Sequence, residues 1–360
     1  MDVKNAFHAT RPQSGVSLIE LMVAMLLGLF LIFGAVTIYN QSRSTFRTTE
    51  AVARLQEVAR LAFDVLESDV RMASYWGLNN RAEFIVNRAS STAGLPAPFT
   101  TTPIDQGVRL SLCGAANSKW AIDLDRYIDG SNNSYTLTCG AFGGAASTAS
   151  DTLIIRRGAE VAPTALDPDR VYLQTSRIQG TLFVPSSSCT DPTSAACIPA
   201  AYAPPASQSR ALVVHAYYIA TSSTLRADVP SLRRKTFGNV NAGTAADAIT
   251  DEEIAPGVED MQVCFGVDTD GDTNIDSYVN PGAVAATASV VSATIWLRIR
   301  SEDRDLSGVD GNSYVPVPTD DATALTQCGA AAVMAAAFTP NDRFRRIVIS
   351  KTIQLRNLRV

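Results

Sequence analysis

Residues 16–39 read VSLIELMVAMLLGLFLIFGAVTIY, an apolar run whose one charged side chain is Glu20. Because a helix rises about 1.5 Å per residue, this run spans about 36 Å as a helix. The hydrocarbon core of a bilayer is about 30 Å thick, so the run is long enough to cross it. The sequence therefore predicts a membrane-spanning helix near the N-terminus.

The residues before this run are polar. Residues 1–15, MDVKNAFHATRPQSG, carry Lys4 and Arg11 and end in Gly15. An ordinary secretory signal is cut after its apolar region, whereas here the predicted processing point, just after Gly15, precedes it. Removal of residues 1–15 as a leader would leave the apolar helix attached as an anchor.

Glu20 lies inside the predicted membrane segment. A carboxylate there is costly and is usually kept for a partner or a function, although it can also reach the interface near a helix end. If the chain is cut after Gly15, the new α-amino group lies on Val16, one helical turn from Glu20. Glu20 would then pair with its own N-terminus or with that of a neighbouring subunit.

The helical pattern continues beyond the apolar run. No proline lies between Pro12 and Pro96, so one helix is expected from about residue 17 to about residue 75. In residues 40–75 apolar side chains recur at three- and four-residue steps, which predicts a stripe buried against a sheet. The stripe comprises Ala51, Leu55, Val58, Ala62, Val65, Leu66, Val70 and Ala73.

Residues 76–360 are expected to form a β-rich head. Residues 76 to about 150 are rich in small and polar residues and indicate a loop-rich connection, and residues 185–209 form a Pro/Ser/Ala-rich loop. Strand-like runs occupy 152–157, 171–175, 180–184, 211–220, 232–237, 258–267, 289–300 and 344–356. A long helix followed by antiparallel strands packed across it is an α+β fold.

All six cysteines lie in the expected head, and none forms a CxxC pair. An even number of cysteines in an exported domain favours disulfides over free thiols. Six cysteines allow fifteen pairings, and the sequential set closes the shortest loops. That set joins Cys113 to Cys139, Cys189 to Cys197, and Cys264 to Cys328.

One acidic segment offers oxygen ligands at alternate positions, as a calcium loop requires. Its candidate ligands are Asp268, Asp270, Asp272, Asn274 and Asp276. The segment departs from an EF-hand, because its glycine is at 271 and Val279 stands where a bidentate glutamate would be. An acidic hairpin turn is the favoured interpretation, and a calcium site is the alternative.

Nothing else in the sequence suggests catalysis or a cofactor. His215 is the one histidine outside the leader, and it lies in an apolar strand, where a structural role is expected. No nucleophile elbow, zinc-protease, phosphate-loop or dinucleotide motif accompanies it. The net charge of -5 and pI near 5.2 give no basic surface for nucleic acid.

Two parts of the sequence resemble a known family. Residues 15–22, GVSLIELM, resemble the class III signal of type IV prepilins and type II secretion pseudopilins. The resemblance implies that a prepilin peptidase cuts after Gly15 and methylates Val16, and that Glu20 guides docking into a filament. Val16 replaces the phenylalanine that is common at this position.

The C-terminal half resembles the PilW family of type IV pilus minor pilins. The resemblance rests on YYIA at 217–220, SLRRKTFG at 231–238, APGVEDMQVCFGVDTDGDTNIDSYV at 255–279 and the final SKTIQLRNLR. It implies the pilin fold, in which the head packs on the second half of the helix. Residues 76 to about 210 carry no resemblance of this kind.

The resemblance implies a structural protein of a Gram-negative bacterium, held in the inner membrane with a periplasmic head and displayed on the pilus after assembly. Its expected partners are the prepilin peptidase, other minor pilins, the major pilin and a tip adhesin. Together the minor pilins would prime pilus assembly. The alternatives are a type II secretion pseudopilin, a head that binds a surface or DNA, and a membrane-tethered enzyme.

Overall fold

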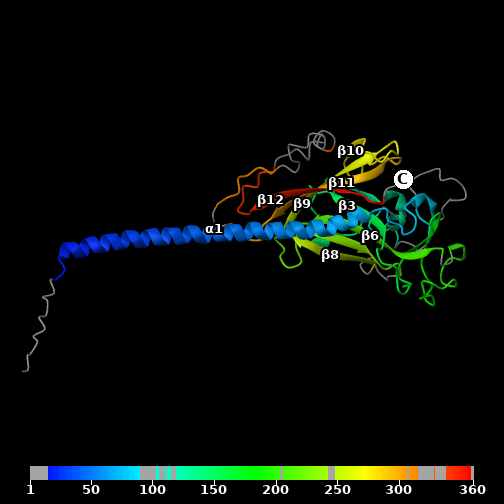
Figure 1. Cartoon of the computed structure of the whole chain (residues 1–360), viewed down its shortest axis with the longest axis horizontal. Coiled ribbons are helices and arrows are strands. Elements are labelled where there is room, and N and C mark those ends of the chain that lie inside the picture. The colour runs from blue at the N-terminus through cyan, green and yellow to red at the C-terminus, as the bar shows by residue number, and fades with distance from the viewer. Residues whose placement is uncertain are drawn as a thin grey trace, which may run out of the picture. The chain divides into compact units, whose positions relative to one another are not determined.

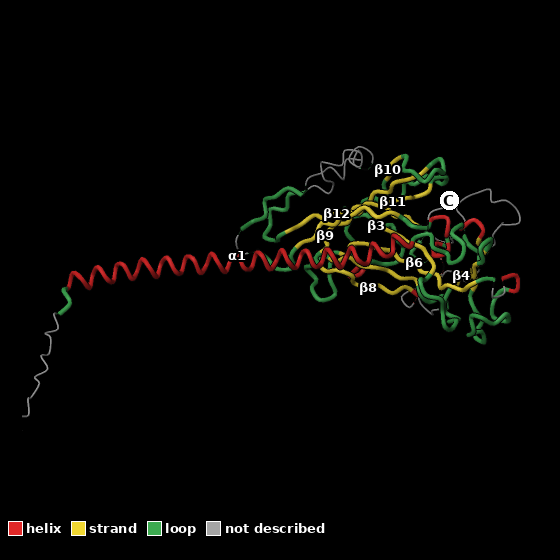
Figure 2. The backbone as a smooth tube through the Cα atoms, viewed as in Figure 1, coloured by secondary structure: helices red, strands yellow, loops and turns green. Residues whose placement is uncertain are grey.

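A computed structural model describes residues 15–89, 103–104, 110, 112–114, 119–202, 206–241, 248–305, 308–314, 328 and 338–357. Apart from Gly15, the expected leader lies outside these residues. The described residues form one long helix, short 3-10 turns and twelve strands (Figures 1 and 2). The chain divides into two compact units, Met1–Ala51 and Val52–Val360.

Helix α1 runs without interruption from Leu18 to Met72. Its apolar first half is exposed, whereas a stripe in its second half is buried in the head. The buried positions are Leu55, Ala59, Ala62, Phe63, Leu66, Asp69 and Val70. Burial of a side chain such as Leu66 or Phe63 contributes about 1.5–3 kcal/mol to folding, so this stripe fastens the helix to the sheets.

The larger sheet has eight strands, and the 13-residue strand β6 is its centre. The order is β1-β5-β4-β6-β3-β2, and β7 pairs with both β6 and β8. All pairs are antiparallel except β1 with β5. The strands are β1 (Ile85–Val86), β2 (Ile128–Ser131), β3 (Thr152–Gly158), β4 (Tyr172–Thr175), β5 (Gly180–Phe183), β6 (Gln208–Ala220), β7 (Ser231–Phe237) and β8 (Ile249–Pro256).

The smaller sheet has four antiparallel strands in the order β10-β9-β11-β12. They are β9 (Val258–Asp268), β10 (Ser277–Val279), β11 (Ser289–Arg300) and β12 (Arg346–Gln354). The predicted α+β pilin fold is confirmed, because a long N-terminal helix precedes sheets that are almost entirely antiparallel.

The head has two large hydrophobic cores that share β6. Tyr217 and Ile219 point into the first core, together with the buried stripe of α1 and strands β9 and β11. Val214 and Ala216 point to the opposite face, into a second core with Trp76 and with Leu110, Trp120 and Leu137 of the loop-rich region. The alternation of side chains along one strand thus joins the helix to the loop-rich part of the head.

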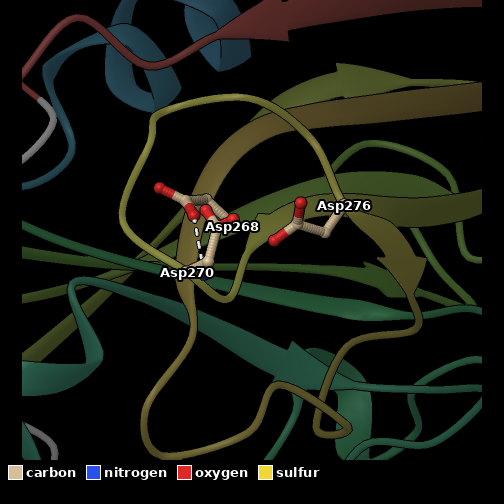
Figure 3. A group of neighbouring side chains, drawn as sticks. All are labelled: Asp268, Asp270 and Asp276. Atoms are coloured by element: carbon tan, nitrogen blue, oxygen red, sulfur yellow. Dashed lines mark hydrogen bonds between the residues drawn. The ribbon is translucent and has the colours of Figure 1, made fainter.

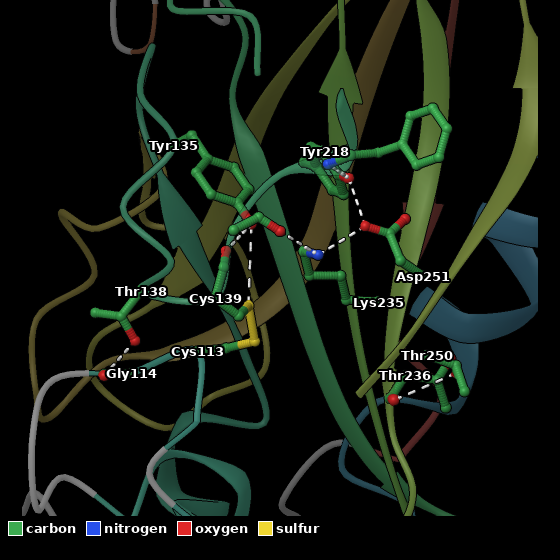
Figure 4. The surroundings of a disulfide bond; sticks show 12 residues. Cys113, Gly114, Tyr135, Thr138, Cys139, Tyr218, Lys235, Thr236, Thr250 and Asp251 are labelled. Atoms are coloured by element: carbon green, nitrogen blue, oxygen red, sulfur yellow. Dashed lines mark hydrogen bonds and ion pairs between the residues drawn. A yellow bond between two sulfur atoms is a disulfide. The ribbon is translucent and has the colours of Figure 1, made fainter. Parts of the chain in front are cut away.

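Three disulfides form within the head, and no cysteine is free. They are Cys113–Cys139, Cys189–Cys197 and Cys264–Cys328, which is the sequential pairing. Beside the first of them, Tyr135 donates a hydrogen bond to the backbone oxygen of Cys139, and Lys235 Nζ donates one of 2.8 Å to Gly140 (Figure 4).

Strands β8 and β10 were not expected from the sequence. Residues 249–256, ITDEEIAP, carry three consecutive acidic residues and a proline, all of which are rare in strands. They pair with β7 because Asp251 and Glu253 form ion pairs with Arg233, and Asp251 also bonds to Lys235. Cross-strand charge pairing thus overrides weak strand propensity here.

Candidate assembly site at the helix N-terminus and the polar clusters of the head

The first turn of α1 is closed by Ser17 and Glu20. The backbone N–H of Ile19 donates to Ser17 Oγ at 3.3 Å, and the backbone N–H of Ser17 donates to Glu20 Oε2 at 3.3 Å. This reciprocal pair is a capping box, which satisfies two backbone donors that the helix itself leaves unpaired. The spacing Ser-x-x-Glu is the signal in the sequence that predicts such a cap.

The cap determines where the Glu20 carboxylate lies. It accepts its hydrogen bond from Ser17, the residue that follows Val16 directly. The positive end of the helix dipole favours a negative charge in this first turn. If cleavage follows Gly15, the new α-amino group arises one residue from the nitrogen that Glu20 already binds.

The apolar side chains after this cap are exposed among the residues that the structure describes. Leu18, Leu27, Phe30 and Leu31 are all more than half exposed. In length and composition α1 qualifies as a membrane span, and none of its apolar window is buried. Such a surface fits either lipid or the helices of neighbouring subunits.

A second polar cluster fastens α1 to the head. Asp69 is buried at the helix–sheet contact, where its Oδ1 accepts from Arg157 Nη2 at 2.7 Å and from Arg157 Nε at 3.1 Å. Its Oδ2 is bound by His215 Nδ1 and by the hydroxyl of Tyr217. Arg157 belongs to β3, and His215 and Tyr217 belong to β6.

The surroundings of Asp69 stabilise its ionised form. Burial alone would raise the pKa of Asp69, but the hydrogen bond from His215 and the charges of His215 and Arg157 hold it well below its usual range. The sequence predicts a structural role for His215, but its motifs do not single out Asp69. The available signal was an acidic residue next to Val70 on the apolar stripe.

The acidic segment forms the hairpin turn between β9 and β10. One oxygen from each of Asp268, Asp270 and Asp276 lies within 4.8 Å of the others, so these three could hold a cation (Figure 3). Asp272 and Asn274 are bonded to each other instead, since Asp272 accepts from the backbone and side-chain amides of Asn274 at 2.7 Å each.

Hydrogen bonds within the turn compensate much of the negative charge of its carboxylates. Asp268 accepts backbone hydrogen bonds from Gly271 at 2.7 Å and from Thr273 at 2.9 Å, which lower its pKa. Asp276 accepts from the hydroxyl and backbone N–H of Thr269, which also lower its pKa. At Asp270 the backbone N–H of Asp272 lowers the pKa, but repulsion from the neighbouring carboxylates prevails and raises it.

Two family models match the chain. The prokaryotic N-terminal methylation motif matches residues 10–36, and the model for type IV pilus-assembly protein W, PilW, matches residues 216–357. The first match covers the class III signal and the start of α1, and the second runs from β6 through β12. No curated protein and no solved structure matches the chain.

The signal, the single long helix and the mainly antiparallel head define a prepilin-type pilin. The PilW match over the C-terminal part of the head points to one family within this class of pilins. Together the two matches support a PilW-like pilin of the type IV pilus, with the PilW match confined to residues 216–357.

Proposed function

We propose that this PilW-like pilin primes assembly of the type IV pilus as part of a tip complex with other minor pilins. A prepilin peptidase cuts after Gly15 and methylates Val16, and residues 16–39 then anchor the chain in the inner membrane. The mature helix packs beside those of other minor pilins and of the major pilin. The periplasmic head reaches the cell surface on the assembled pilus, where the complex helps to display an adhesin.

One observation carries the proposal. The capping box holds the Glu20 carboxylate beside the place where the α-amino group of Val16 would form. In an apolar environment each of these charges is costly alone, and pairing offsets the cost. The same carboxylate can reach the N-terminus of a neighbouring subunit, which would guide its docking.

Two features of the head support a role at the end of a filament. The buried stripe of α1 and the Asp69 cluster join the head firmly to the helix, so the head can transmit the orientation of a docked helix. The bulk of residues 76–360 would also crowd a repeating shaft, whereas a tip has room for it.

We assign the head a structural rather than a catalytic role. His215 is buried and bound to Asp69, so it is not available to a substrate. The PilW match favours a type IV pilus over a type II secretion pseudopilus.

Neutralising Glu20 tests the proposal. We expect Glu20→Gln to leave the chain in the membrane fraction but to reduce the number of pili per cell, counted by electron microscopy. Glu57→Gln, a matched change at an exposed position of α1, should leave pilus number unchanged. Normal pilus numbers with Glu20→Gln would contradict the proposed docking role.

A further inference from the structure

The peptide bond between Gly15 and Val16 lies just outside the helix. Helix α1 begins at Leu18, and Gly15, Val16 and Ser17 are exposed and non-helical. A Cβ atom placed on Gly15 would meet no atom within 4 Å, so nothing in the described structure crowds this bond. Exposed, irregular backbone is where proteases cut most readily, because it fits an active site without prior unfolding.

Ser17 is the residue at which the helix stops. Its C=O accepts the first helical hydrogen bond, from the N–H of Leu21 at 3.1 Å, and its Oγ accepts from the N–H of Ile19 at 3.3 Å. Its own N–H donates to Glu20 Oε2 at 3.3 Å. The N–H, C=O and hydroxyl of Ser17 are thus all bonded to the first turn of α1, as in an N-cap.

These bonds exclude a further turn of helix before Leu18. In an α-helix each N–H donates to the C=O four residues earlier. A helix that began one turn earlier would need the Ile19 N–H to bond to the C=O of Gly15, and the Ser17 N–H to bond to the C=O of residue 13. The Ser17 hydroxyl and the Glu20 carboxylate accept these two hydrogen bonds instead. The cap therefore keeps the Gly15 carbonyl out of a helical turn.

The conformation of this carbonyl matters for hydrolysis of the bond. A water molecule adds to the carbonyl carbon of Gly15, and the C–N bond to Val16 then breaks. The products are a carboxylate on Gly15 and an ammonium group on Val16. Within a helix both polar groups of a peptide are bonded along the chain and neighbouring turns cover it, so cleavage has to wait for local opening.

We propose that Ser17 is a positioning residue for leader removal, because its cap on α1 holds the Gly15–Val16 bond outside the helix for the prepilin peptidase. The peptidase and the position of the cut come from the proposed function, on which this proposal rests. Gly15 acts in the same direction, since glycine is itself a poor helix former. Loss of the cap should therefore slow the cut rather than abolish it.

Three substitutions of Ser17 separate a cap from a hydroxyl that the peptidase itself recognises. Ser17→Ala removes both the cap and the hydroxyl. Ser17→Asn removes the hydroxyl but keeps a side-chain acceptor, and asparagine is as favourable as serine at an N-cap. Ser17→Gly also lacks the hydroxyl, yet glycine at this position costs a helix little. Residue 17 lies outside the compact unit Val52–Val360, so these changes leave the fold of the head intact.

The rate of leader removal in cells tests the proposal. The peptidase is induced in cells that already hold the uncut full chain, and intact mass of the membrane fraction follows the loss of the leader over time. We expect Ser17→Ala to be cut about fivefold more slowly than the parent chain, since a lost N-cap shifts a helix equilibrium by about this factor. Ser17→Asn and Ser17→Gly should be cut within about twofold of the parent rate.

Thr37→Ala is the matched control. It removes a hydroxyl from the same helix, but that hydroxyl donates to the C=O of Phe33 at 2.8 Å inside α1 and caps nothing. Its rate of cleavage should equal that of the parent chain.

Equal rates for Ser17→Ala and the parent chain would overturn the proposal. So would rates for Ser17→Asn and Ser17→Gly that are both as slow as that of Ser17→Ala, because the hydroxyl would then act by direct contact with the peptidase. In both cases the parent chain still begins at Val16, so the proposed function stands. A parent chain that stays uncut after induction contradicts the proposed function itself, and the role of Ser17 falls with it.

Discussion

Asp69 is the residue on which the contact between helix and head depends most. It is an ionised carboxylate in a buried position, and it is acceptable there because Arg157, His215 and Tyr217 all donate to it. Removing one member of a buried charge cluster leaves its partners unpaired, which usually costs about 3–5 kcal/mol.

We therefore expect Asp69→Asn to lower the melting temperature of the full chain in detergent. The free energy of unfolding should fall by about 3 kcal/mol or more. Asp64→Asn is the matched control, since Asp64 lies on the same helix with an exposed side chain. Its effect should stay within about 0.5 kcal/mol. Equal melting temperatures for the two variants would show that the cluster contributes nothing to stability.

Asp151 predicts a pH dependence of the opposite sign from that of Asp69. Burial raises the pKa of Asp151 to about 7, although it accepts backbone bonds from Asn133 and Val263. The folded chain then holds a proton between pH 4 and 7 that the unfolded chain releases, so the Asp151 contribution to stability falls as pH rises through this range.

The slope from Asp151 is at most about 1.4 kcal/mol per pH unit. Asp151→Asn should remove this slope from unfolding free energies measured in urea between pH 5 and 7. A variant with the same slope as the parent chain would assign the proton to another group. Asp69 adds the reverse trend, because its stabilisation is present above about pH 4 and is lost as pH falls further.

Among the elements of the head, the disulfides differ in the length of chain that each closes and in the contacts of the segment beside it. Cys113–Cys139 closes a separation of 26 residues, and the segment after Cys139 is bound to strands β6 and β7 (Figure 4). There the backbone N–H of Phe142 donates to the Tyr218 hydroxyl at 2.9 Å, and the Arg233 guanidinium stacks on the Phe142 ring at 3.7 Å. Cys189–Cys197 closes a separation of only 8 residues.

Replacing both members of each pair by serine should therefore have unequal effects on stability. Chain entropy alone gives about 3.5 kcal/mol for Cys113–Cys139 and about 2.5 kcal/mol for Cys189–Cys197. The contacts of Phe142 and Gly140 with β6 and β7 should widen the difference. Thermal unfolding of the two double variants measures it, and a larger loss for the Cys189–Cys197 variant would reverse this ranking.

The acidic turn between β9 and β10 carries a prediction about metal removal. Because Asp268 and Asp276 are bound by Gly271, Thr273 and Thr269, the turn should fold without a cation. We expect the same melting temperature in excess EDTA and in millimolar CaCl2. A rise with calcium that Asp270→Asn abolishes would instead establish the calcium site that the spacing of the aspartates suggests.

At the scale of the whole molecule, the sequence predicted the parts that depend on local pattern. The unbroken helix followed from its apolar period and from the lack of proline, and the alternating runs predicted most of the long strands. The division into two sheets and the pairing of β8 did not follow. They depend on long-range contacts such as Asp251 with Arg233 and Lys235, which no local period reveals.

The candidate site likewise has one part that the sequence alone predicts and one part that only the fold reveals. Gly15, Val16 and Glu20 form a compact motif, so the sequence alone marks them, and the structure adds the Ser17–Glu20 cap. The Asp69 cluster gathers residues from α1, β3 and β6. Arg157 lies 88 positions after Asp69 in the chain, and His215 lies 146 positions after it. Only the fold brings them together.

The proposed function requires that the chain is processed as a prepilin and enters the pilus. Intact-mass and N-terminal analysis of the protein from sheared pili and from membranes, with and without the prepilin peptidase, tests it most directly. We expect a chain that begins at methylated Val16 only when the peptidase is present and that is recovered in the pilus fraction. An uncut chain, or one cut after the apolar helix, would contradict it.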